Sequence, residues 1–112
     1  TILEVTGVEA TRTLAGRSLL QAPTRVAALM EVWSMRDPKR PNMAGLHGAD
    51  WSWIESDGFE EYYDLTTDPY QVENAAASLT PARRAALKSR LAELQHCRGR
   101  RCIGLEDTPL PA

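Results

Sequence analysis

The segment from Asp50 to Thr66 constrains the fold of this chain more than any other. Two stretches rich in aromatic residues, Asp50–Ser56 and Phe59–Thr66, flank an Asp57-Gly58 pair. An Asp-Gly pair favours a two-residue turn, because glycine takes positive φ at no steric cost. We therefore expect the two stretches to pair as the strands of an antiparallel hairpin.

The sequence leaves the register of this hairpin open. A two-residue turn pairs Trp53 with Tyr62, whereas a three-residue loop with a bulge pairs Trp53 with Tyr63. In either register two acidic side chains face each other near the turn, which is mildly unfavourable. The two alternatives place opposite sets of side chains on a given face of the hairpin.

Downstream of the hairpin the chain turns from strand to helix. Asp68-Pro69 ends the second strand, and residues 71–78 are expected to form one or two helical turns. A longer helix is predicted over residues 80–97, because Thr80 suits its N-cap and Pro81 its first position. An apolar stripe at helical spacing would face the core; it consists of Leu87, Leu91 and Leu94.

The two ends of the chain carry weaker signals. Thr1–Val8 begins on apolar periodicity and reads as the end of a helix with Gly7 as its stop, or as a processed N-terminus. Gly99 follows the helix over 80–97 as a stop. The tail over 103–112 contains two prolines and is expected to be extended or partly disordered.

Between the first helix and the hairpin, residues 9–23 read as a loop and residues 25–35 as an apolar strand. Residues 36–48 hold several prolines and glycines and read as another loop. The 112 residues therefore predict one small α+β domain. It has a small antiparallel sheet of three to four strands, formed by residues 25–66, with a long C-terminal helix packed on one face.

Composition excludes several classes of protein. The net charge of -2 argues against a nucleic-acid binder. No apolar run approaches the roughly 20 residues that span a bilayer. The first residues lack the basic segment of a signal peptide.

Charge is divided sharply between two parts of the chain. Asp50–Asn74 contains acidic residues and no Lys or Arg, whereas Thr80–Gly104 is strongly basic. We favour a solvated basic helix that the acidic hairpin partly neutralises. The alternative is a free-standing module that binds an anion such as a sulfated glycan. Its candidate contacts are Arg83, Arg84, Lys88 and Arg90.

No catalytic residue and no metal ligand is expected on this chain. Glu60 and Glu61 are neighbours on a strand, so they point to opposite faces and cannot converge on one cation. Neither His47 nor His96 has a nucleophile at a recognisable motif spacing. His47 lies in the predicted loop over 36–48 and is a candidate for lining the rim of a substrate pocket shared with another domain.

Cys97 and Cys102 lie close together around a glycine. A pair that closes so small a loop indicates a local disulfide, and hence an oxidising compartment. The alternative is two free thiols in a frayed tail.

Four motifs, in the same order along the chain, resemble those near the C-terminal end of sulfatases. Thr1–Val8 resembles a Pro-Thr-Ile-Leu-Glu-Leu-Ala-Gly-Val segment, and Gly16–Leu20 resembles the Asp-Gly-Arg-Ser-Leu-Leu that usually follows it, with Ala15 in place of the Asp. Leu94–Cys102 is similar to the Leu-Gln-x-Cys-x-Gly-x-x-Cys ending of the N-acetylglucosamine-6-sulfatase-like branch.

The remaining motif is Glu61–Asn74, which resembles the signature Glu-Leu-Tyr-Asp-Leu-x-x-Asp-Pro-x-Glu-x-x-Asn. Tyr62 stands where Leu is usual and Gln71 where Glu is usual. The chain departs from the family at Gly45–Gly48, where many relatives read Val-Arg-Thr. That departure puts in doubt any substrate contact carried over to this loop.

The resemblance implies that the chain is the C-terminal subdomain of a sulfatase with an alkaline-phosphatase-like catalytic domain. Residues 1–8 would end a helix of that missing N-terminal domain. The parent enzyme would hydrolyse aryl or sugar sulfate esters with formylglycine and Ca²⁺ or Mg²⁺, outside the cytoplasm. The fragment, which needs no cofactor of its own, would be inactive, and its uncovered sheet face would favour self-association. The resemblance also supports a disulfide between Cys97 and Cys102.

Two further readings accompany this resemblance. The related one is the tail of a phosphatase or phosphonate hydrolase of the same superfamily. The other concerns Cys97–Arg101, which matches the Cys-x-x-x-Arg spacing of the formylglycine motif. Its middle residue is Gly99 where the motif has Pro or Ala, and it follows a helix instead of opening one. We therefore interpret Cys97 as structural.

Overall fold

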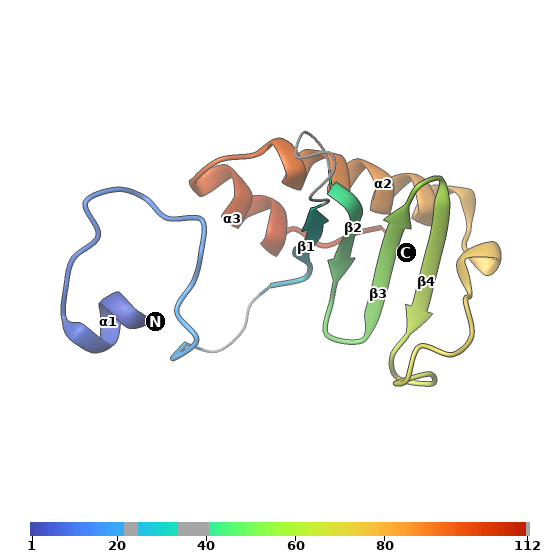
Figure 1. The fold of residues 1–112 in the computed structure, drawn as a ribbon, viewed down its shortest axis with the longest axis horizontal. Coiled ribbons are helices and arrows are strands. Elements are labelled where there is room, and N and C mark those ends of the chain that lie inside the picture. The colour runs from blue at the N-terminus through green and yellow to red at the C-terminus, as the bar shows by residue number, and fades with distance from the viewer. Residues whose placement is uncertain (22–24, 34–40, 112) are drawn as a thin grey trace.

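A computed structural model describes residues 1–21, 25–33 and 41–111 of the chain (Figure 1). It confirms the α+β class, with a four-stranded sheet and a C-terminal pair of helices. The elements follow in the order α1 (Ile2–Thr6), β1 (Ala28–Trp33), β2 (Pro41–His47), β3 (Trp51–Ser56), β4 (Phe59–Asp64), the 3-10 helix η1 (Ala76–Ser78), α2 (Pro81–His96) and α3 (Arg100–Asp107).

The sheet is an antiparallel meander in which each strand pairs with its neighbours in sequence, in the order β1-β2-β3-β4. Its hairpin between β3 and β4 has the two-residue turn, with Trp53 opposite Tyr62. Asp57 and Gly58 both have positive φ, 44° and 89°. Such a turn matches the right-handed twist of its two strands, and it fixes the register that the sequence left open.

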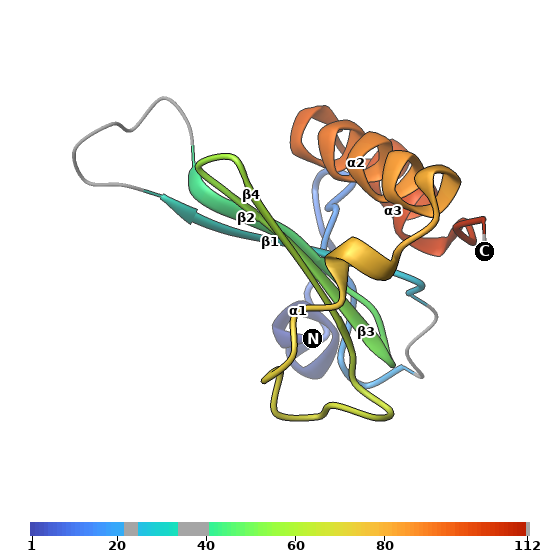
Figure 2. The same cartoon turned by 90° about the vertical axis from the view of Figure 1, so that its right-hand side faces the viewer.

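One face of the sheet packs against α2 (Figure 2). Trp53 and Leu46 are neighbours across β3 and β2, and both are fully buried on this face. The predicted apolar stripe of α2 meets them. Burying one such side chain stabilises the fold by about 1.5–3 kcal/mol, so this layer of contacts forms the core of the domain.

α2 begins where the sequence predicts. The hydroxyl of Thr80 accepts a hydrogen bond from the backbone N–H of Arg83 at 3.1 Å, which satisfies one donor of the first turn. Pro81 occupies the first helical position. The helix ends at His96, just before the disulfide between Cys97 and Cys102.

The loop predicted over residues 36–48 is wrong for its second half. Residues 41–47 form β2, a central strand that pairs with both β1 and β3. Residues 36–40 lie outside the described part of the chain. Gly45 reads as a loop residue in the sequence, but a Cβ at this position would lie 2.5 Å from the carbonyl oxygen of Trp53. The glycine therefore permits close strand packing.

The predicted extended tail is also wrong in part, because Arg100–Asp107 forms α3. Gly99 does not stop α2; it precedes α3 with a φ of 57°. The guanidinium of Arg90 donates to the carbonyls of Leu105 and Thr108, and so holds the end of α3 against α2. These long-range bonds favour a helix that local sequence does not signal. Residues 71–78 contain only the single turn of η1.

Residues 1–21 form an arm that extends from the body of the domain (Figure 1). α1 lies in this arm and ends at Gly7, whose φ of 68° and ψ of 17° confirm the predicted glycine stop. Its apolar side chains are exposed, Ile2 to 79% and Val5 to 68%. The body does not cover this apolar surface.

Within the described residues, no helix has the length and apolar character required to cross a bilayer.

Candidate functional site: the segment after strand β4 and its basic partner helix

The segment after β4 is ordered by carboxylates that accept backbone hydrogen bonds. One carboxylate oxygen of Asp64 accepts from the hydroxyl of Thr66 at 2.5 Å and from its backbone N–H at 2.9 Å. These two hydrogen bonds hold the pKa of Asp64 below its usual range, and the bond from the hydroxyl has the larger effect. The first turn after the strand is therefore fixed by an ionised side chain.

Asp68 does the same for the next turn. Its Oδ1 accepts from the backbone N–H of Val72 at 3.0 Å, and its Oδ2 accepts from that of Glu73 at 2.9 Å. These two bonds lower the pKa of Asp68. Both carboxylate oxygens are thus engaged with the chain itself.

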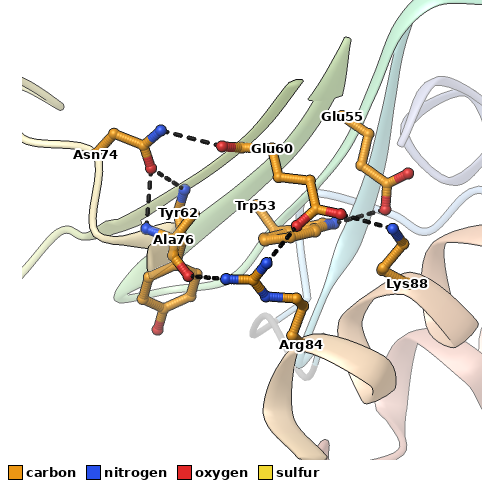
Figure 3. A network of polar contacts seen from close by, with 8 residues as sticks. All are labelled: Trp53, Glu55, Glu60, Tyr62, Asn74, Ala76, Arg84 and Lys88. Atoms are coloured by element: carbon orange, nitrogen blue, oxygen red, sulfur yellow. Dashed lines mark hydrogen bonds and ion pairs between the residues drawn. The ribbon is translucent and has the colours of Figure 1, made fainter. Parts of the chain in front are cut away.

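Asn74 joins this segment back to the sheet (Figure 3). Its side-chain oxygen accepts from the backbone N–H groups of Tyr62 at 3.1 Å and Ala76 at 2.9 Å. Its amide nitrogen donates to the carbonyl of Glu60 at 3.0 Å. The polar residues at the Asp, Asp and Asn positions of the signature therefore all satisfy backbone groups, which is the behaviour of a scaffold.

The basic helix and the acidic hairpin meet at Glu60 (Figure 3). Its Oε1 lies 2.6 Å from the ammonium of Lys88, and its Oε2 lies 3.2 Å from the guanidinium of Arg84. The hydrogen bond to Glu60 raises the pKa of Lys88. The opposing carboxylate of Glu55 accepts from the indole N–H of Trp53 at 3.1 Å. These partners offset the like-charge pairing expected near the turn.

The four cations proposed as anion contacts each have a partner inside the domain. Arg84 also donates to the carbonyl of Ala76 at 2.6 Å. Arg83 lies over the ring of Trp51, 5.3 Å from its centroid, and donates to the carbonyl of Pro111 at 2.7 Å. Arg90 is buried. The anion-contact hypothesis stays a prediction, and this arrangement supplies a structural role for every one of these side chains.

His47 lies at the end of β2 and is exposed. It pairs with Ala28 of β1 and Ser52 of β3, on the sheet face away from α2. The structure does not bring it near any of the basic residues of α2 described above. Its predicted place at a substrate rim would need a second domain against that face.

Cys97 and Cys102 form a disulfide across the junction of α2 and α3, with their Cα atoms 5.3 Å apart. A sulfur held in this bond cannot be the thiol that is oxidised to formylglycine. Cys97 therefore does not fit that group. The described residues also gather no cluster of three or more His, Cys, Asp or Glu side chains that could hold a metal ion.

A depression of about 350 Å³ lies between the hairpin turn and α2. Glu55, Glu60 and Lys88 contribute charges of both signs to its wall. The carboxylate of Glu60 and the ammonium of Lys88 are already paired with each other there. The depression thus adds no set of unpaired groups converging on one reacting atom.

Two residues with central structural roles were quoted in the sequence only as parts of motifs. Asn74 bridges β4 and η1, and Arg17 binds the end of α3 through Asp107 at 2.7 Å. Local residue spacing predicts neither contact, because each joins segments that are distant in sequence. The one sequence feature that marked these two residues was their place within the sulfatase-like motifs.

Comparison with known proteins supports part of the resemblance. No protein-family model matches the chain. Over 45 residues it is 42% identical to the Extracellular sulfatase SULF-1 homolog of Drosophila melanogaster. The match covers 40% of this chain and 4% of the length of that protein. The chain therefore contains a sulfatase-related region.

Proposed function

We propose that this chain is the C-terminal subdomain of a sulfatase, and that it supports a catalytic domain which hydrolyses sulfate esters. The observation that carries the proposal is the 42% identity over 45 residues to an extracellular sulfatase. The order of the four sequence motifs agrees with it. The geometry of the signature agrees as well, because its Asp and Asn side chains hydrogen-bond to backbone groups. In this proposal the catalytic residues therefore belong to another domain.

Uncovered apolar surface is a second support for a partner domain. On the sheet face away from α2, Met30 and Met43 are each 40% exposed and Val32 is 57% exposed. The arm adds the exposed side chains of Ile2 and Val5. A small domain rarely leaves two such surfaces open to water. An N-terminal catalytic domain is the occupant that the resemblance supplies.

In this proposal, formylglycine and the Ca²⁺ or Mg²⁺ ion belong to the parent's catalytic domain. The subdomain positions that domain and forms part of the cleft rim, with His47 as its candidate rim residue. The disulfide and the relative's description as extracellular both support a location outside the cytoplasm.

The first test compares the 112-residue chain with the full polypeptide that contains it. Both are assayed for turnover of an aryl sulfate and for bound Ca²⁺. We expect both properties in the full polypeptide and neither in the chain alone. Turnover by the isolated chain, or a full polypeptide inactive on sulfate esters, would sink the proposal.

A second test addresses the scaffold role of the signature. Replacing Asn74 with Ala removes the acceptor of two backbone N–H groups and should lower the unfolding free energy by about 1–3 kcal/mol. Well below the melting temperature, KM for the sulfate ester should be unchanged. The exposed Ser78→Ala change is the control and should alter neither quantity. A raised KM in the Asn74 variant at full stability would instead place this residue at the substrate.

A further inference from the structure

The arm over residues 1–21 is attached to the body through arginines and one end of α3. The guanidinium of Arg17 donates to the carbonyl of Ile103 at 2.9 Å and pairs with the carboxylate of Asp107 at 2.7 Å. Its side chain is 22% exposed, which is far less than the surrounding arm. The hydrogen bond to Asp107 raises the pKa of Arg17 above its ordinary value, so this guanidinium stays charged.

A second set of contacts at the same place holds the chain that leads from the arm into β1. The carboxylate of Glu106 lies 2.8 Å from Arg25 and 3.6 Å from Arg17. The backbone carbonyl of Glu106 accepts from the N–H groups of Val26 at 2.7 Å and Ala27 at 3.2 Å. The last turn of α3 therefore binds both the arm and the entry to the sheet, and Figure 1 shows α3 between them.

α3 itself is positioned by two connections to α2, one covalent and local and the other formed by long-range hydrogen bonds. One is the disulfide between Cys97 and Cys102, which ties the start of α3 to the residue after α2. The other is the buried guanidinium of Arg90, which holds the carbonyls of Leu105 and Thr108 near the end of α3. Since α3 is short, its helical structure depends on these connections more than on local propensity.

We propose that α3 is a latch for the N-terminal arm, and that the Cys97–Cys102 disulfide keeps this latch closed. With the disulfide intact, α3 presents Glu106 and Asp107 to Arg17 and Arg25. When a dithiol reduces the disulfide, the sulfur–sulfur bond takes up two electrons and two protons. The products are two cysteine thiols and the oxidised dithiol. The start of α3 then loses its covalent tie, and the acidic end of the helix is released from the arginines more often.

The consequence for the arm is local opening, which is distinct from global unfolding. The core cluster itself contains Trp53 and the apolar stripe of α2, whereas Cys97 and Leu105 are only partly buried and pack against it from outside. Opening the latch leaves that core layer in place. The proposed role of α3 as a latch does not depend on the proposed sulfatase function. If both hold, the disulfide also fixes the direction in which the arm leads toward the catalytic domain.

Trypsin offers a direct readout, because it cleaves after an arginine only when the guanidinium enters its specificity pocket. Arg17 and Arg25 are engaged by α3 in the closed state, whereas Arg12 is exposed in the same arm. The full polypeptide is digested briefly with and without dithiothreitol, and the peptides are quantified by mass spectrometry. The Cys97→Ser, Cys102→Ser double variant repeats the test without a reductant.

In the oxidised protein we expect cleavage after Arg12 and strong protection of Arg17. Loss of the disulfide should speed cleavage after Arg17 and Arg25 by about 5- to 30-fold, which matches a modest shift in the open population. Cleavage after Arg12 should not change, and Arg84 within α2 should stay uncut.

A second variant tests the latch with the disulfide intact. Asp107→Asn removes the closest carboxylate of Arg17 and should speed cleavage there by a similar factor. Glu73→Gln, at an exposed carboxylate in the segment after β4, is the matched control and should have no effect. The inference is overturned if Arg17 is cut as fast as Arg12 in the oxidised protein. It is equally overturned if loss of the disulfide leaves Arg17 protected, or if it exposes Arg84 to the same extent as Arg17.

Discussion

Gly45 provides the sharpest test of how the sheet is packed. The residue lies in the central strand β2, opposite Ile54 of β3, and is buried. A Cβ added here would lie 2.5 Å from the carbonyl oxygen of Trp53 and 3.4 Å from the Cα of Ile54. Both are backbone atoms of a central strand, so neither can rotate away. The Gly45→Ala change therefore forces the two strands apart.

The size of the effect follows from that contact. Since real Cβ contacts stay beyond 3.0 Å, β2 and β3 would have to separate locally by about 0.5 Å. Overpacking of this kind typically costs about 1–3 kcal/mol. Part of this cost is offset, because the entropic penalty of folding is smaller for alanine than for glycine by about 0.5–1 kcal/mol. We expect a net loss of about 1–2 kcal/mol, which corresponds to a melting temperature lower by roughly 5–15 °C.

Gly104→Ala is the matched control. Gly104 lies within α3, and a Cβ there meets nothing within 4 Å. The same chemical change should raise stability by about 0.5–1 kcal/mol. Urea unfolding followed by tryptophan fluorescence measures both variants. The reasoning would be refuted if Gly45→Ala were as stable as the parent chain, or if the two variants shifted stability in the same direction.

Three further outcomes can be checked by similar measurements. Thr80→Ala should lower the unfolding free energy by about 1 kcal/mol and Thr80→Ser by much less, since only the alanine removes the cap at the start of α2. Lys88→Met should cost about 0.2–1 kcal/mol, because solvent screens the pair with Glu60, and the cost should shrink in high salt. Because the folded pKa of Lys88 is raised, its contribution is complete below about pH 10.4 and is lost as the pH rises through the folded value. The folded pKa of Asp68 is lowered, so its contribution is present above about pH 3.9 and is lost as the pH falls through the folded value. Asp68→Asn should therefore flatten the acid limb of the stability curve, and an unchanged limb would contradict the two backbone bonds assigned to this carboxylate.

The features that the sequence predicted well are those decided within a few residues. Asp57 and Gly58 can both adopt positive φ, which is a property of the residues themselves. Thr80 and Pro81 start a helix for equally local reasons. The strand–turn–helix order, the α+β class and the side of α2 that faces the sheet follow from such signals and from periodicity.

Local sequence signals predicted only part of the candidate site. The acidic hairpin and the basic helix were expected to neutralise each other in part, and Glu60 does pair with Lys88 and Arg84. The contacts of Asn74 could not be read, because they join a segment after the hairpin to the backbone of the hairpin itself. A hydrogen bond between distant segments leaves no periodic mark in the sequence.

The sequence alone thus determined the hairpin, the start of the long helix and the resemblance to sulfatases. Only the tertiary structure decided that residues 41–47 are a central strand and that 100–107 are a helix. In both places the local residues favour loops: Pro41 and Gly45 do so in the first, and Gly104 with the prolines that follow the segment does so in the second. The pairing of β2 with both β1 and β3 outweighs that preference in the first segment, and the hydrogen bonds from Arg90 to the end of α3 outweigh it in the second. Such contacts stabilise an element only once its partners are in place, and for that reason no local pattern predicts them.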